Sequence, residues 1–182
     1  MGRFNRHTTG LFVLSLVLLP DAVSSREPIP PGYESTAAAF GIPGPLLYAV
    51  ALTESGRSLG SSNAFRPWPW TLNVAGQGYY FESRGAAWRA LSGWLEAGRR
   101  SIDIGLMQVN WRYHENRLGD AWQALDPYYN LAVGAAILKA CAANARDWMV
   151  SVGCYHAPSD PDRAARYRER VNARLRQIEY GG

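Results

Sequence analysis

Leu46-Leu47-Tyr48-Ala49-Val50-Ala51-Leu52-Thr53-Glu54-Ser55-Gly56 is an apolar stretch that carries one acidic residue near its end. Two prolines stand just before it and a glycine ends it, so the pattern predicts a short helix over residues 44–55. Helical spacing at i, i+3, i+4 and i+7 places Glu54 on one stripe with the three apolar residues Leu47, Val50 and Ala51. Glu54 is therefore predicted to face the core.

An acid that faces a core has two explanations. Burial disfavours the charged form of a carboxyl group, which keeps it protonated and able to donate a proton near neutral pH. The alternative is structural: Glu54 turns toward solvent or pairs with Arg57 at the helix end, since ion pairs of this kind are common. The stretch alone does not decide between them.

The N-terminal residues have the pattern of a secretory signal. Two arginines precede an apolar run over residues 11–19, and small residues follow up to Ser24. The run is about half the length of a bilayer-spanning helix, so a retained membrane anchor is the less favoured alternative. We expect export to the periplasm and no stable membrane span after cleavage. The predicted organisation is a signal peptide over residues 1–24, an extended leader over 25–32 and one domain over 33–182.

Composition and charge set further limits. The 182 residues are enough for one domain with a sizeable core. Removal of residues 1–24 takes away two arginines and one aspartate, so the net charge goes from +4 to +3. Six arginines crowd positions 163–176, on one predicted helix. A solvated helix face explains them better than a nucleic-acid footprint, because acids interrupt the run, and no nucleic-acid partner is expected. Attraction to an acidic cell-wall polymer is a secondary possibility.

The chain has two cysteines, Cys141 and Cys154. Export would place both in an oxidising compartment, so we expect a disulfide that closes a short loop. The alternative is a pair of buried thiols on neighbouring helices.

Local patterns predict a mainly helical domain with one small β-hairpin. The hairpin is expected from two aromatic runs separated by a turn, residues 65–73 and 76–81, with two prolines restricting the first run to an edge. Further helices are expected at Tyr33 to Phe40, from Ser83 to Gly98, from Asp103 to Trp111, from Asp126-Pro127, from Asp147 to Tyr155 and from Asp160-Pro161 onward.

Three later stretches complete a pattern that begins with Glu54-Ser55. In Gly105-Leu106-Met107-Gln108, the glycine permits close approach of another chain, and the glutamine offers both a donor and an acceptor. Small and large residues alternate over Asn130 to Leu138. Tyr155-His156 then puts a phenol at the end of an apolar helix.

Together, in this order, the four stretches resemble the soluble lytic transglycosylase family, whose fold is shared with goose-type lysozyme. The resemblance covers about residues 40–170 and implies a lysozyme-like helical domain. Two departures are present. His156 stands where the family pattern has asparagine, and the interval from Glu54 to Gly105 is long. The Trp- and Pro-rich insertion resembles that of the small transglycosylases that accompany conjugation and secretion machines.

The resemblance implies a peptidoglycan substrate and one acid that acts twice. Glu54 would protonate the bond between N-acetylmuramic acid and N-acetylglucosamine, then remove a proton from the C6 hydroxyl to form a 1,6-anhydro sugar. Tyr155 would hydrogen-bond and orient the carboxyl group. Ser55 and Gln108 would hold substrate groups, and Met107 would form an apolar wall. Trp68, Trp70, Tyr79 and Tyr80 would offer stacking surface for sugar rings or, alternatively, cap the core.

Two other functions compete with this one. A lysozyme-like hydrolase would use a second carboxylate to activate water, and Asp103 is the candidate, although a helix cap explains it more simply. A non-catalytic wall-binding or assembly factor would need no acid. No metal site is expected, because the histidines have no partner at ligand spacing, and no cofactor is expected.

Overall fold

The computed structural model describes residues 1–2, 28–60, 64–143 and 147–180. The predicted signal peptide from residue 3 onward and residues 25–27 of the predicted leader therefore lie outside the described residues. Helices dominate, which confirms the mainly α prediction. The helices are α1 Pro31–Phe40, α2 Gly44–Ser55, α3 Arg84–Glu96, α4 Trp111–Leu118, α5 Ala121–Ala124, α6 Pro127–Ala142, α7 Trp148–His156 and α8 Pro161–Tyr180.

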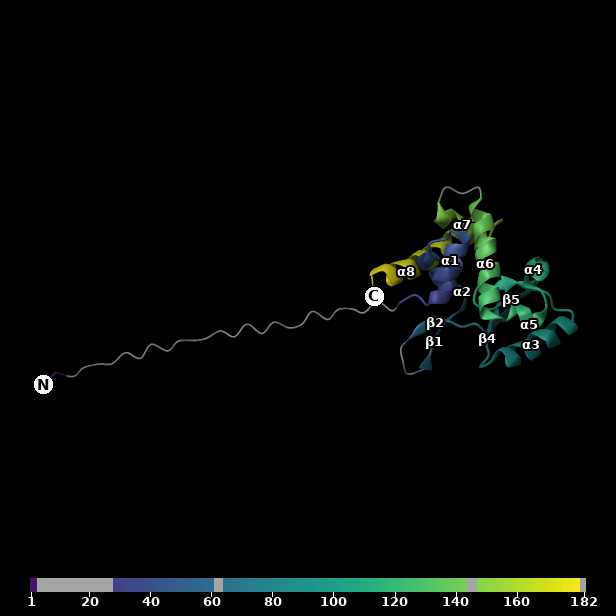
Figure 1. Cartoon of the computed structure of the whole chain (residues 1–182), viewed down its shortest axis with the longest axis horizontal. Coiled ribbons are helices and arrows are strands. Elements are labelled where there is room, and N and C mark those ends of the chain that lie inside the picture. Colours follow the sequence, from purple (N-terminus) through teal and green to yellow (C-terminus); the bar gives the residue numbers. More distant parts are fainter. Residues whose placement is uncertain (3–27, 61–63, 144–146, 181–182) are drawn as a thin grey trace.

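Helix α2 is the centre of the core. Its bounds match the predicted helix, and most of its apolar side chains are fully enclosed. It packs against α1 and along α8, while α7 lies between α6 and α8 (Figure 1). Among the described residues no single helix is long and apolar enough to cross a membrane, whereas the bent pair α1 and α2 passes on length and composition alone.

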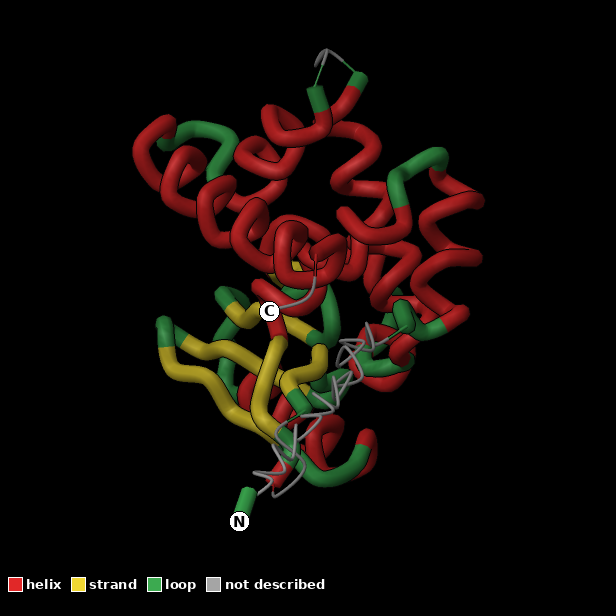
Figure 2. Tube along the Cα trace, turned by 90° about the vertical axis from the view of Figure 1, so that its left-hand side faces the viewer, coloured by secondary structure: helices red, strands yellow, loops and turns green. Residues whose placement is uncertain are grey.

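The strands form two small antiparallel sheets. Figure 2 shows them gathered on one side of the helical part. Their bounds are β1 Gly56–Ser58, β2 Phe65–Pro67, β3 Thr71–Val74, β4 Gln77–Tyr80, β5 Ile102–Ile104 and β6 Val109–Asn110. One sheet pairs β1 with β2, and the other has the order β4-β3-β5-β6.

The predicted hairpin is only partly right. The hairpin exists between β3 and β4, where Leu72 faces Tyr79 across the pair. The run predicted as its first strand divides at Pro69, and its beginning, β2, pairs instead with β1 directly after α2. Pro67 lies in this separate two-stranded sheet, where it costs no bond of the larger sheet.

The helix predicted from Asp103 to Trp111 is wrong over all of its length except Trp111. Ile102 and Ile104 are buried while Asp103 between them is partly exposed, which is the two-residue period of a strand. Gly105 has φ +78° and Gln108 has φ +46°, so a tight turn follows and joins β5 to β6. The helix begins only at Trp111, capped by Asn110 and not by Asp103.

The other helix starts follow the predicted caps. The side chains of Ser83, Asp126 and Asp147 each accept hydrogen bonds from backbone N–H groups in the first turn of α3, α6 and α7. The helical spacing of residues 83–98 predicts that Trp88 faces inward on one stripe with Leu91, and this prediction is wrong. Trp88 is 40 % exposed, and its ring meets the Trp122 ring edge-on.

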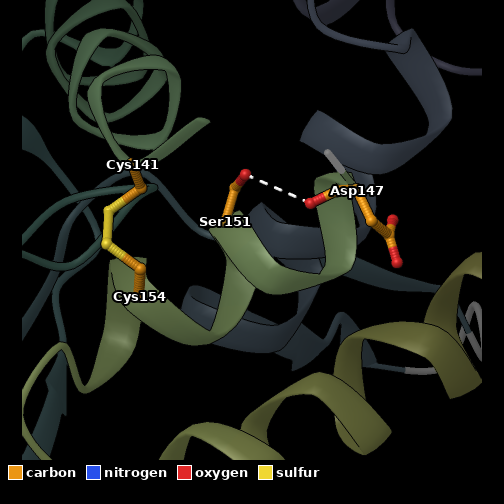
Figure 3. Close-up of a disulfide and its surroundings, with 4 residues drawn as sticks. All are labelled: Cys141, Asp147, Ser151 and Cys154. Atoms are coloured by element: carbon orange, nitrogen blue, oxygen red, sulfur yellow. Dashed lines mark hydrogen bonds between the residues drawn. A yellow bond between two sulfur atoms is a disulfide. The ribbon is translucent and has the colours of Figure 1, made fainter. Parts of the chain in front are cut away.

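Cys141 and Cys154 form the expected disulfide. It joins the last turn of α6 to α7, with the two Cα atoms 5.8 Å apart (Figure 3). In the first turns of α7, the Ser151 hydroxyl donates to the Asp147 carbonyl oxygen at 3.4 Å. The disulfide therefore ties together two helices that carry side chains of the candidate site described below.

Replacing both cysteines with serine should lower the free energy of unfolding by about 3 kcal/mol, because the cross-link restricts the unfolded chain. Urea unfolding of parent and double variant measures this difference. Reduction of the parent should give the same shift. A parent protein that labels with two thiol reagents before reduction would contradict the pairing.

Candidate active site

Glu54 lies in the last turn of α2, immediately before the chain enters β1. Its side chain is 13 % exposed, so the prediction of an enclosed carboxyl group holds and the alternative of a solvent-facing acid does not. The guanidinium of Arg57 lies over the rings of Trp68 and Tyr80, at 4.9 Å and 5.2 Å from their centroids. Arg57 therefore contacts aromatic rings, and no ion pair between it and Glu54 is found among the described residues.

The nearest partners of Glu54 come from α7 and α8. The Tyr167 hydroxyl donates to Glu54 Oε1 at 2.6 Å, and His156 Nδ1 lies 3.8 Å from the same oxygen. The imidazole and the phenol ring stack face to face, with centroids 4.2 Å apart and planes 4° apart. The Tyr167 hydroxyl and His156 therefore both lie at Oε1 of the Glu54 carboxyl group, while Oε2 accepts no hydrogen bond from a described residue.

Tyr155 does not make the bond that was expected of it. Its hydroxyl donates to the Met107 carbonyl oxygen at 2.6 Å, and the bond to the carboxyl group belongs to Tyr167. Burial raises the pKa of Tyr155 well above its usual range, and the charges of Glu54 and Asp103 raise it further. Burial, the Glu54 charge and the hydrogen bond to Glu54 likewise raise the pKa of Tyr167. Both phenols therefore keep their protons and act as donors.

The turn from Gly105 to Gln108 joins the remaining motifs. The Ser55 hydroxyl donates to the Leu106 carbonyl oxygen at 2.8 Å. The Met107 N–H donates to Asn130 Oδ1 at 3.0 Å, and the carbonyl of Met107 accepts the Tyr155 bond. One side chain each from α2, α6 and α7 thus binds the backbone of this turn. The four sequence stretches therefore meet at one place, because one of them forms the turn and the other three each donate a hydrogen bond to its backbone or accept one from it.

Two glycines make this assembly possible. A Cβ on Gly105 would lie 2.5 Å from the Asn130 amide carbon, and its φ of +78° suits glycine. A Cβ on Gly134 of α6 would lie 2.5 Å from Met107 Cβ. Neither position has room for a side chain, so the turn can lie directly on α6.

The predicted supporting residues are therefore mostly structural. Ser55 and Met107 are fully buried, and both contact the turn or α6 and not an open surface. Gln108 is partly exposed. Its amide nitrogen donates to the carbonyl oxygens of Thr71 and Gly105, at 3.1 Å and 2.9 Å. Of the supporting set, Gln108 and Tyr155 are partly exposed, whereas Ser55 and Met107 are fully buried.

Asp103 lies on β5, where it faces Asn110 across the strand pair and accepts a hydrogen bond from its Nδ2 at 2.7 Å. Burial raises the pKa of the Asp103 carboxyl. The hydrogen bond from Asn110 lowers it, the Glu54 charge raises it, and His156 lowers it. Asp103 therefore interacts electrostatically with Glu54. The explanation of Asp103 as a helix cap is wrong, because Asp103 lies in β5 and Asn110 caps α4.

The aromatic residues of the insertion are partly engaged. The Trp68 indole N–H donates to the Phe81 carbonyl oxygen at 2.7 Å, and the rings of Trp68 and Trp70 meet edge-on. The ring of Tyr79 packs against Trp94. Tyr80 is 48 % exposed, which leaves it the most accessible stacking surface of the predicted four.

Tyr167→Phe should lower kcat roughly 10- to 100-fold and leave KM nearly unchanged, because a hydrogen bond to a charged group is lost at the carboxyl. The kinetics are measured on soluble glycan fragments. Tyr155→Phe is the matched control, since it removes a hydroxyl that bonds the turn and not Glu54. It should mainly lower the free energy of unfolding, by about 1–3 kcal/mol. Equal kcat for Tyr167→Phe and parent would contradict the positioning role.

The spacing of the last predicted helix places Tyr167 on its inward face, and no sequence motif assigns Tyr167 a role in the site. A buried tyrosine needs a partner for its hydroxyl, which was the available signal. The partner lies 113 residues earlier, however, and no local pattern indicates it. His156 was noted as a departure from the family pattern, and the structure places it against the carboxyl group.

The mainly helical architecture with small sheets beside Glu54 is consistent with a lysozyme-like domain. Residues 33–176 match the family described as the transglycosylase SLT domain. The match spans well over half of the chain, so this chain belongs to the transglycosylase SLT domain family. Comparisons with curated proteins and with solved structures find no match. Family membership supports lytic transglycosylase activity on peptidoglycan.

Proposed function

We propose that this protein cleaves the β-1,4 bond between N-acetylmuramic acid and N-acetylglucosamine and leaves a 1,6-anhydro-muramic end. The observation that carries the proposal is the enclosed carboxyl group of Glu54, 13 % exposed and held through Oε1 by Tyr167. With Oε1 occupied as an acceptor, a proton on Glu54 would be carried by Oε2. General acid catalysis by such a group supplies about 10²- to 10⁴-fold in rate.

The proposed reaction balances without water. Glu54 gives its proton to the glycosidic oxygen as the C1–O bond breaks, and the bonding electrons stay on that oxygen. The acetamido group of the muramic acid stabilises the positive charge at C1. The Glu54 carboxylate then removes the proton of the C6 hydroxyl while O6 bonds to C1, which restores the acid.

Product masses test this proposal. Anhydro ends are lighter than reducing ends by one water, so mass spectrometry of a sacculus digest separates them. We expect anhydro ends. Reducing muramic ends would refute the lyase reaction.

A hydrolase is the second candidate, and the position of Asp103 favours it. Asp103 interacts with the charge of Glu54 and would be the group that activates water. Asp103→Asn separates the two candidates. It would remove most activity in a hydrolase, and it should leave anhydro-end formation largely intact in a transglycosylase.

We further propose that the enzyme is exported to the periplasm and opens the wall locally for a conjugation or secretion apparatus. The signal-like residues 1–24 and the Trp- and Pro-rich insertion support this role. N-terminal sequencing of periplasmic protein should begin at Ser25. A deletion strain should assemble fewer envelope-spanning complexes and recover with the parent gene but not with Glu54→Gln.

A further inference from the structure

An open groove of about 650 Å³ is lined mainly by residues of α8 and lies beside the candidate site. Helix α8 is the yellow helix of Figure 1. Its lining residues come from the end of α7 and from two turns and more of α8: His156, Arg163, Arg166, Glu169, Arg170 and Ala173. The three arginines follow each other at i, i+3 and i+7, which places them on one face of the helix. The three arginines therefore all face the groove from the same side of α8.

The groove carries an excess of positive charge. Three guanidinium groups and one carboxylate line it, and the arginine side chains are exposed. Within the described part of the chain, no acid lies in ion-pair distance of Arg163 or Arg166. Their charges are therefore available to a ligand.

The groove is continuous with the surroundings of Glu54. His156 lines the groove and also lies 3.8 Å from Glu54 Oε1. The guanidinium of Arg170 lies 5.3 Å from the ring centroid of Tyr167, whose hydroxyl holds the same oxygen. The groove therefore adjoins the carboxyl group through His156 and Arg170.

We propose that the groove binds the carboxylates of the peptide stem carried by the muramic acid at the cleaved bond. This inference rests on the proposed function. The cleaved bond belongs to C1 of a muramic acid, whose lactyl group bears a peptide rich in free carboxylates. That peptide must leave the glycan close to Glu54. Arginine forks match carboxylates in geometry and charge, and lysine does so less well.

Three forms of the same soluble glycan strands test the groove. The first keeps its peptide stems, the second has lost them to an amidase, and the third keeps stems whose carboxylates are converted to amides. The parent enzyme should cleave the first form about fivefold faster, in kcat/KM, than the other two. The factor is modest because exposed ion pairs contribute little each.

Arg163→Gln/Arg166→Gln should bring this ratio close to one. Arg176→Gln is the matched control, because Arg176 is exposed on the same helix outside the groove, and it should keep the ratio of the parent. Equal rates of the parent on all three forms, or a ratio that survives the double substitution, would overturn the proposal. Polyphosphate is tested as an inhibitor of cleavage of strands without stems. If it inhibits the parent and not the double variant, the groove binds phosphate polymers, and the proposal is overturned.

Binding without cleavage separates this proposal from the proposed function. Glu54→Gln protein is sedimented with each strand form after immobilisation of the strands on beads. If retention depends on the stems and is lost when the two arginine substitutions are added, this result supports stem binding by the groove even if the parent cuts none of the strands. Retention that ignores the stems overturns it even if the parent is a fully active transglycosylase.

Discussion

Replacing Glu54 with glutamine should lower the rate of peptidoglycan digestion at least about 100-fold while the fold remains intact. Glutamine has nearly the same shape as glutamate. Its amide oxygen can still accept the Tyr167 hydrogen bond, so packing at this 13 % exposed position is kept. What is lost is the titratable proton that both steps of the proposed reaction require. The rate is followed as solubilisation of purified sacculi.

Glu96→Gln is the control for this substitution, because Glu96 is an exposed acid at the end of α3 and should have no effect on digestion. Thermal unfolding of both variants should match that of the parent. If Glu54→Gln digests sacculi as fast as the parent, Glu54 is not the acid. If the parent binds sacculi and never digests them, the alternative of a wall-binding factor gains.

The helical part of the fold was predictable because its helix ends carry strong local signals. The prolines before α2 and at the start of α6 and α8 fix a favourable backbone angle in the first turn, and aspartate caps precede α6 and α7. Each of these helices also contributes apolar residues to the core, so propensity, caps and burial agree. The predicted bounds 44–55 of α2 match the structure for this reason.

The sheet was harder to predict because its strands are short and their partners are distant. Ile102-Asp103-Ile104 is too short for its two-residue period to outweigh a helical pattern, and β5 pairs with β3 some thirty residues earlier. The turn that follows places Gln108 at φ +46°, which an isolated glutamine does not indicate. Tertiary contacts from three helices compensate for this conformation, and no local pattern reports them.

The residues of the candidate site also divide into those that local sequence predicts and those that only distant contacts determine. Glu54 could be identified from the sequence because an acid on the apolar stripe of a helix is unusual and needs only local spacing to be recognised. The family resemblance assigned the bond to the carboxyl group to Tyr155, whereas the structure gives it to Tyr167. Both are tyrosines on inward faces of late helices, so no local pattern distinguishes their partners. Only the structure assigns one hydroxyl to the turn and the other to the carboxyl group.

Replacing Asn130 with leucine should lower the free energy of unfolding by about 3–5 kcal/mol. Asn130 is 1 % exposed and satisfies three backbone groups at once. Its Oδ1 accepts from the Met107 N–H, and its Nδ2 donates to the carbonyl oxygens of Ile104 and Ala124 at 2.9 Å and 3.2 Å. Leucine has the same branched shape and a larger volume, so the loss comes from buried polar groups without partners and from overpacking, and not from a cavity. Urea unfolding measures it.

The same substitution should reduce activity beyond its effect on the folded fraction, because the turn also holds Ser55, the residue after Glu54. Activity is therefore compared at a temperature where both proteins are fully folded. Asn172→Leu, at an exposed position of α8, is the control and should change stability by less than about 0.5 kcal/mol. An Asn130→Leu protein within about 1 kcal/mol of the parent would mean that the turn from Gly105 to Gln108 is held by its own backbone, and that the convergence of three helices on it contributes little.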